Sequence, residues 1–227
     1  MATFLDMVQE LHGLAGGGGN PPNRIDNLSG EYSRLVRFVA DAEIEIQNWW
    51  ANWNFLWTQT TSGFHVTANG RTQPPEDLAT WDDTGLFIRE GTTYDWEPIN
   101  VRDYNDDRGF LNTGDTGYPA TAYILPDNSL FFDPTPDRDY PFLADYWKRP
   151  VRLTEADQVT PIPDAFTRTV VVGNALIYFG AYDDAPELQR YGQRLVDENR
   201  SQLENSQLPI DKSAWIMGRG FEVQTER

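Results

Sequence analysis

The sequence predicts an α+β protein: a helical bundle made of an N-terminal and a C-terminal helix pair, an inserted antiparallel β-sandwich-like domain, and an extended C-terminal arm. Three observations lead to this prediction. Apolar residues recur with a helical period near both ends of the chain, the period is lost in the middle, and the last residues are apolar without a period. We therefore expect the bundle over 1–57 and 160–205, the β domain over 58–159 and the arm over 206–227.

The first predicted helix follows Thr3, whose side chain can cap the N-terminus together with Asp6 three residues later. Apolar residues continue near a 3.6-residue period as far as Leu14. The run 16–22, with four glycines and two prolines, then ends the helix and is predicted to be a linker. It lacks the Gly-Lys-Ser/Thr ending of a phosphate-binding loop, so it predicts no nucleotide site.

A longer helix is predicted to begin near Ser29 and to continue through the tryptophan-rich segment. In such a helix Trp49, Trp50, Trp53 and Trp57 occupy two adjacent stripes, so aromatic rings cover a wide face of the last two turns. Two interpretations stay open: the rings fill the core, or part of this face contacts a neighbouring subunit. We take the four tryptophans as a candidate subunit interface.

Between residues 58 and 160, Gly, Pro, Asn and Asp interrupt short apolar runs, which is typical of β-structure. The predicted strands are 63–67, 84–89, 97–101, 120–124 and 130–133, with 151–153 as a short edge strand. Residues 123–132 predict a hairpin. Because proline does not continue a central strand, Pro134, Pro136 and Pro141 predict that the chain leaves the sheet after this hairpin.

The second helix pair follows Pro161 and Pro163. We expect Asp164 to cap a helix that ends near Asp183, and a last helix from about Ala185 to Asn205. Neither helix pair carries enough apolar surface to be stable alone, so the two pairs should pack as one bundle.

The final segment, 206–227, contains too many large apolar side chains for a solvated tail. The residues expected to contact a partner are Ile210, Trp215, Ile216, Met217 and Phe221. This arm has three basic and three acidic residues, whereas 58–159 carries 18 acidic against 8 basic residues. A neutral arm can dock on a partner, or on its own domain, without like-charge repulsion.

Composition excludes several functional classes. A formal charge of −17 argues against electrostatic binding to DNA or to an anionic membrane. The absence of cysteine excludes disulfides, thiolate metal sites and cysteine nucleophiles. The two histidines, His12 and His65, are expected to be structural or exposed, and no catalytic motif occurs. We therefore expect no catalysis, no cofactor and no metal.

No apolar run approaches the length of a membrane span, and the N-terminus lacks the pattern of a signal peptide. The sequence thus predicts a protein of the cytoplasm, or of a particle assembled there. Acidic pairs such as Asp82-Asp83 could serve glycoside hydrolysis or calcium binding only if they converged in space, which adjacent loop residues rarely do.

Five short stretches carry a resemblance to a known family. They are residues 3–11, 30–47, 53–57, 134–137 and 161–166, which are rich in aromatic residues and prolines. Their order resembles that of the adaptor, or head-to-tail connector, proteins of tailed bacteriophages, especially short-tailed ones. The resemblance spans about residues 3–200 and does not extend well over the arm.

The resemblance implies a virion structural protein without enzymatic activity, assembled in the host cytoplasm and placed in the neck between head and tail. It implies a dodecameric ring that joins the portal protein to tail nozzle or tail fibre proteins and extends the channel through which DNA passes, with no membrane contact. It also implies that the C-terminal arm reaches the portal.

A different functional class is a glycan-binding module or glycosidase of a phage tail, since exposed aromatic rings stack on sugars. Its candidates are Trp81, Tyr94, Trp96, Tyr104 and Tyr118. The interpretation to be preferred from the sequence is that these rings fill the core of the β domain.

Overall fold

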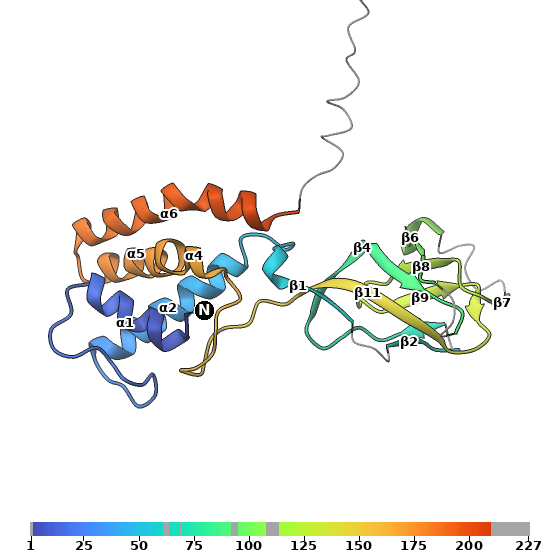
Figure 1. Cartoon of the computed structure of the whole chain (residues 1–227), viewed down its shortest axis with the longest axis horizontal. Coiled ribbons are helices and arrows are strands. Elements are labelled where there is room, and N and C mark those ends of the chain that lie inside the picture. The colour runs from blue at the N-terminus through green and yellow to red at the C-terminus, as the bar shows by residue number, and fades with distance from the viewer. Residues whose placement is uncertain (1, 61–63, 69, 92–94, 108–113, 210–227) are drawn as a thin grey trace, which may run out of the picture.

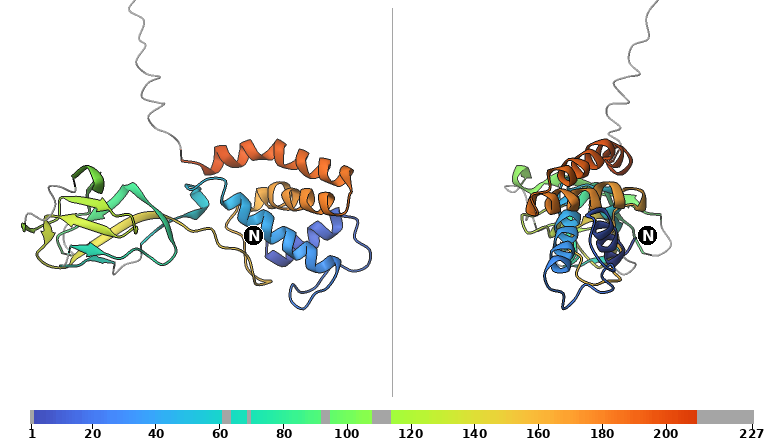
Figure 2. Two further views of the ribbon diagram at one scale, coloured as in Figure 1. Left: turned by 180° about the vertical axis from the view of Figure 1, so that it is seen from behind. Right: turned by 90° about the vertical axis from the view of Figure 1, so that its left-hand side faces the viewer.

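The structure is a computed structural model that describes residues 2–60, 64–68, 70–91, 95–107 and 114–209. It is an α+β fold, as predicted, in which helices gather at one end of the molecule and strands at the other (Figure 1). The left view in Figure 2 shows an elongated molecule in which the chain crosses from helices to strands and later returns. We call residues 48–57 the outgoing connector and residues 149–163 the return connector.

Helix α1 (Phe4–Leu14) begins with the predicted capping box. The Asp6 amide donates to Thr3 Oγ1 at 3.2 Å, and the Thr3 amide donates to Asp6 Oδ2 at 2.9 Å. The amides of Phe4 and Leu5 donate to carbonyl oxygens of Gln158 and Ala156 in the return connector. The first turn of α1 therefore depends on a segment more than 150 residues away in sequence.

Helix α2 (Glu31–Gln47) begins two residues later than predicted and ends well before Trp57. The predicted extension to Trp57 is wrong. Asn48 stops the helix, with its Nδ2 donating to the Ile44 carbonyl at 2.7 Å, and the outgoing connector then turns away. A short 3₁₀ turn, η1 (Asn54–Leu56), leads into β1 (Trp57–Gln59).

The C-terminal helices are α4 (Asp164–Phe166), a π-helical turn η2 (Thr167–Val172), α5 (Gly173–Tyr182) and α6 (Pro186–Gln207). The last helix matches the prediction closely, with Pro186 in its first turn. Asp164 does not cap its helix, because Pro163 occupies the N-cap position. Instead, Asp164 Oδ1 accepts a hydrogen bond from the Ala2 amide at 2.8 Å.

Helices α5 and α6 approach so closely that glycine is needed at the crossing. A Cβ atom on Gly192 would lie 2.6 Å from the Gly173 carbonyl oxygen, and one on Gly180 would lie 2.6 Å from the Gln189 amide nitrogen. Buried side chains from α1, α2, η2, α5 and α6 form one hydrophobic cluster at this end of the molecule, with Leu35, Ile46 and Leu203 among its members.

The strands build two larger sheets and one small pair. The first sheet has the order β1-β11-β4-β5, with β2 also paired to β11; the second has the order β3-β9-β8-β6; and β10 pairs with β7. Most strand pairs are antiparallel, as predicted, but the pairs β6/β8 and β10/β7 are parallel and depart from the prediction. Bounds not given above are β2 (His65–Val66), β3 (Arg71–Thr72), β4 (Leu78–Ile88), β5 (Glu97–Pro98), β6 (Asn100–Asp103), the helical turn α3 (Tyr104–Asp107), β7 (Thr116–Gly117), β8 (Thr121–Ile124), β9 (Leu130–Asp133), β10 (Thr135–Pro136) and β11 (Tyr140–Lys148).

The predicted hairpin is confirmed by the antiparallel pairing of β8 with β9. The chain leaves the sheet of this hairpin after β9, as predicted. The expectation that Pro141 stays outside a central strand is wrong, because Pro141 lies in β11, the strand on which the first sheet is centred. Pro141 pairs with His65 of β2, where the Phe142 amide makes the hydrogen bond to the Phe64 carbonyl at 3.0 Å, and on the other side it lies just past the end of β4 at Ile88. The Pro141 carbonyl still accepts from the Arg89 amide at 3.2 Å.

The predicted edge strand 151–153 is also wrong, since these residues belong to the return connector and form no strand. Side chains of both larger sheets contribute to a second hydrophobic cluster, including Leu86 and Phe142 from one sheet and Ala122 and Phe132 from the other. The chain therefore has one cluster among the helices and one among the strands, with the two connectors between them.

Candidate functional site

We call the two connectors, together with the adjoining ends of β1 and β11, the waist of the molecule. The four tryptophans of the outgoing connector lie there, but they do not share one helical face. Trp53 is fully buried and stacks on Phe55 with ring centroids 5.1 Å apart. Its Nε1 donates to the Ile46 carbonyl at 3.1 Å, so the ring folds back onto the end of α2. Trp53 is thus part of the core of the helical end and offers no surface to another subunit in this fold.

Trp49 and Trp50 contact the last turns of α6. The Arg200 guanidinium lies 4.5 Å from the centroid of the Trp49 ring, and Trp50 Nε1 donates to Glu204 Oε1 at 3.1 Å. Arg200 Nε donates to the same oxygen at 2.9 Å. Partial burial raises the pKa of Glu204, but the hydrogen bonds from Arg200 and Trp50 outweigh it and lower the pKa overall. These contacts place the end of α6 beside the outgoing connector.

Trp50 and Trp57 remain substantially exposed, at 42% and 45% of their surface. Trp57 opens β1, where it lies opposite Trp147 of β11, and it lines a groove between the two connectors. The predicted interface residues are therefore not equivalent: Trp50 and Trp57 offer surface, Trp49 is half-buried, and Trp53 is in the core.

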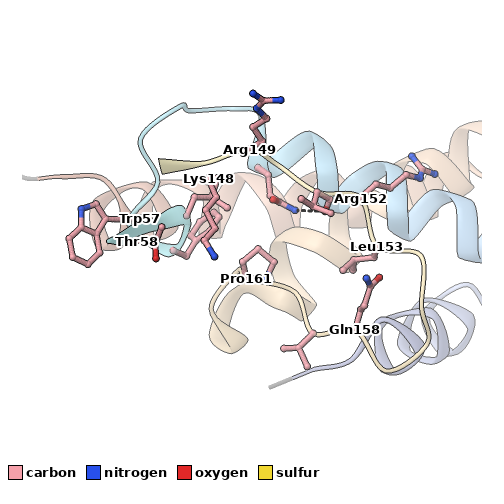
Figure 3. A pocket seen from close by; sticks show the side chains of 13 residues that line it. Trp57, Thr58, Lys148, Arg149, Arg152, Leu153, Gln158 and Pro161 are labelled. Carbon is pink, nitrogen blue, oxygen red and sulfur yellow. Dashed lines mark hydrogen bonds between the residues drawn. The ribbon is translucent and has the colours of Figure 1, made fainter. Parts of the chain in front are cut away.

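The groove at the waist has a volume of about 320 Å³. Three of the large apolar residues exposed in the described part of the chain line it: Trp57, Val151 and Val159. Figure 3 shows Trp57 at one end, Leu153 and Gln158 at the other and Pro161 between them. The lining comes from both connectors and the adjoining ends of β1 and β11, so the groove exists only when the two crossings lie side by side.

Three cationic residues flank the groove: Lys148, Arg149 and Arg152. The Arg149 and Arg152 guanidinium groups point away from its middle in Figure 3. Arg152 pairs with Asp41 of α2, and Lys148 Nζ lies 3.4 Å from Asp77 Oδ2. The two guanidinium groups therefore lie at the edge of the groove, whose lining combines apolar side chains such as Trp57 and Val151 with polar ones such as Thr58 and Gln158.

A buried carboxylate of α2 accepts a hydrogen bond from the return connector near this groove. Glu43 of α2 is fully buried, and its Oε1 accepts from Gln47 Nε2 at 2.7 Å and from Thr160 Oγ1 at 2.8 Å. Within the described residues its Oε2 has no hydrogen-bond partner. Burial raises the pKa of Glu43 to about 7, although the hydrogen bonds from Thr160 and Gln47 act in the opposite direction.

Comparison with known proteins gives the family of the chain. The sequence pattern of the family described as SU10 adaptor protein matches residues 2–212, which includes every described element. The chain belongs to the SU10 adaptor protein family. No curated protein matches the chain. The match confirms the resemblance to bacteriophage adaptors and assigns the chain to a family of virion structural proteins.

The SU10 adaptor match ends at residue 212, so most of the predicted portal-binding residues fall outside it. Ile210, Trp215, Ile216, Met217 and Phe221 also lie outside the described residues. Their role stays a prediction from the sequence.

The described residues of this SU10 adaptor protein offer little for the glycan-binding alternative. Trp81 is buried, Tyr104 and Tyr118 are half-buried, and Tyr94 lies outside the described residues. Trp96 is exposed, but the Arg89 guanidinium lies over its ring at 4.4 Å. Among the described residues, these rings do not form one exposed aromatic surface on which a sugar could stack.

Titratable side chains of this family member do not gather into a described metal site. Across the placed residues, no group of three His, Asp or Glu side chains is arranged to hold a metal ion. His12 is buried against Tyr32, with ring centroids 5.7 Å apart, and His65 is exposed on β2. In the same part of the chain, no helix is both long and apolar enough to cross a bilayer.

Signals for the waist were partly present in the sequence. The tryptophan density between residues 49 and 57 indicated a contact surface, but the helical spacing assigned to it was wrong. Val151, Val159 and Glu43 were missed because nothing local distinguishes them. They become notable only when the return connector packs against α2 and the outgoing connector.

Proposed function

We propose that this chain is the adaptor, or head-to-tail connector, of a tailed bacteriophage virion. Copies of the chain form a closed ring of twelve that binds the portal protein on one side and tail nozzle or tail fibre proteins on the other, and extends the DNA channel. The observation that carries the proposal is the SU10 adaptor family match over residues 2–212. The exposed apolar surface at the waist supports it, because a ring needs a contact surface on every copy.

Within this proposal, residues 1–57 and 160–205 act as a helical bundle domain and residues 58–159 as an inserted β domain. The separate hydrophobic clusters of the two ends support this division. Exposed Trp50 and Trp57, with half-buried Trp49, contribute to the contact between neighbouring copies. In a closed ring this contact is heterologous, so the waist of one copy meets a different surface of the next.

Charge supports a channel through which DNA passes without binding. The chain carries −17 overall, so DNA phosphates gain no counterion release from contact with most of its surface. The arm, being neutral, is the segment best suited to contact the portal without repulsion.

The test is assembly on the cognate portal, followed by electron microscopy and native mass spectrometry. We expect twelve copies of the chain per portal ring, with density that continues the portal channel. Failure to bind the portal, or binding as isolated monomers, would contradict the proposal.

The role of the arm is tested by a deletion that begins at residue 210. The structure requires this boundary, since α6 runs to Gln207 and Leu208 packs against the helical cluster. We expect an unchanged circular dichroism spectrum and melting temperature with loss of portal binding. Portal binding at full strength by the shortened chain would exclude the arm as the portal contact.

A further inference from the structure

We infer that the waist groove is the resting site of the chain's own C-terminal segment, residues 210–227, before the chain joins a particle. This goes beyond the proposed function, which concerns only what the arm contacts in the assembled virion. Three observations carry the inference: the groove, the place where the described chain ends, and the chemistry of the segment.

The groove has the character of an unoccupied contact site. Trp57, Val151 and Val159 line it with 45%, 63% and 42% of their surfaces exposed. Its volume of about 320 Å³ is at the lower end of the range for clefts that bury a small ligand, which suits one or two large side chains. Leaving such a surface in water is unfavourable.

The described chain ends beside the outgoing connector, which also contributes residues to the lining of the groove. Helix α6 runs towards the waist, where Glu204 accepts from Trp50 of the outgoing connector (Figure 1). Eighteen residues follow Pro209, and an extended chain of that length reaches up to about 60 Å. The segment can therefore enter the groove from its own α6, or pass around the waist to do so.

The segment has the chemistry that the groove accepts. It contains Ile210, Trp215, Ile216, Met217, Phe221 and Val223, whose burial needs an apolar surface. Its three acidic and three basic residues leave it without net charge, so the acidic body does not repel it.

Binding in cis has a consequence for assembly. The groove and the arm are both candidate contact surfaces, and each covers the other in the free chain. Release of the arm towards a portal then uncovers the groove beside it. The tether raises the local concentration of the segment to the millimolar range, so even a weak contact is populated.

Disulfide trapping tests the inference, because the natural chain has no cysteine and only introduced thiols can form a disulfide. The test variant is full-length Val151→Cys with Ile216→Cys. The matched control is Asn52→Cys with Ile216→Cys, since Asn52 is exposed on the outgoing connector and does not line the groove. If the segment is only tethered to α6 and has no resting site, the two variants should form their intramolecular disulfides at similar rates, because Asn52 lies near the Trp50 contact with α6.

We expect intramolecular disulfide formation at least tenfold faster for the Val151 pair than for the Asn52 pair, after correction for the reactivity of each thiol with a small reagent. Adding Val159→Asp to the Val151 pair should remove this excess, and melting temperatures verify that each variant folds.

Equal rates for the two pairs overturn the inference. A disulfide-linked dimer as the main product also overturns it, since the groove would then take the segment of another copy. Neither result depends on ring formation, so the proposed adaptor function is tested separately.

Discussion

At the scale of single residues, the four tryptophans of the waist separate into a core residue and surface residues. Trp53 is fully buried and donates to the Ile46 carbonyl, whereas Trp57 is 45% exposed. We expect Trp53→Ala to lower the free energy of unfolding by about 3–5 kcal/mol, as large aromatic truncations in cores do. Trp57→Ala should change it by less than about 1 kcal/mol. Urea denaturation of both variants checks this, and a similar loss in each would show that Trp57 is structural.

The variant Trp57→Ala also tests the proposed contact between copies. If Trp57 contributes to the proposed ring contact, Trp57→Ala should weaken ring formation on the portal by tenfold or more while the monomer stays folded. Titration of the variant against portal, with the number of bound copies counted by native mass spectrometry, measures the effect. Wild-type assembly by Trp57→Ala would remove this residue from the interface.

Glu43 gives the chain a residue-scale dependence on pH. Burial raises its pKa to about 7, well above the value of about 4.3 in an unfolded chain. Between these values the folded state holds a proton that the unfolded state has released. The contribution of Glu43 to stability is therefore complete at low pH and is lost as the pH rises through about 7.

Glu43→Gln removes this dependence without removing the acceptor oxygen for Gln47 and Thr160. We expect the variant to match the natural chain in stability near pH 4.5 and to exceed it by about 1–3 kcal/mol at pH 8. Chemical denaturation of both chains across this range gives the difference, in which all other titrating groups cancel. A variant that is less stable than the natural chain at pH 8 would show that the carboxylate is needed in its ionised form.

At the scale of elements, the crossing of α5 and α6 is limited by backbone contact. A Cβ atom on Gly192 would lie 2.6 Å from the Gly173 carbonyl oxygen, so Gly192→Ala must push the helices apart. We expect a loss of about 1–3 kcal/mol despite the better helix propensity of alanine. Gly13 in α1 is the matched control, because no atom lies within 4 Å of its Cβ position. Gly13→Ala should leave stability equal or slightly higher, and thermal unfolding of both variants distinguishes the two sites.

Elements whose signals are local could be predicted from the sequence. The capping box of Thr3 and Asp6, the hairpin of β8 and β9 and the helix after Pro186 all depend on residues close to one another in the chain. The errors arise where distant contacts decide. Helix α2 stops at Gln47 although the tryptophan spacing continues, because burial of Trp53 against the end of α2 favours a turn.

Strand β11 is a second element whose structure is decided by distant contacts. Pro141 is unfavourable in the middle of a sheet, and its position is acceptable because β4 ends at Ile88 and the neighbouring Phe142 amide makes the hydrogen bond to β2. The groove could not be predicted at all, since Trp57 and Val151 are brought together by two crossings that are almost 100 residues apart in sequence. The tryptophan cluster indicated where a contact surface lies, and the fold determines which of its rings are available.

At the scale of the whole molecule, the charge of −17 opposes the proposed ring, because twelve acidic copies must approach one another closely. Trp50, Trp57, Val151 and Val159 expose apolar surface at the waist, and apolar contact is not weakened by salt. Screening shortens the range of the repulsion from about 30 Å at 0.01 M salt to about 10 Å at 0.1 M.

We therefore expect ring formation on the portal to be weakest at the lowest salt and to strengthen as sodium chloride rises from 0.01 to 0.3 M. Binding isotherms at four salt concentrations measure this, with the melting temperature of the free chain recorded at each one as the control for monomer stability. Assembly that weakens steadily with salt would instead mean that the cations around the groove, Lys148, Arg149 and Arg152, hold the copies together through ion pairs, and the waist would have to be reassigned from an apolar contact to an electrostatic one.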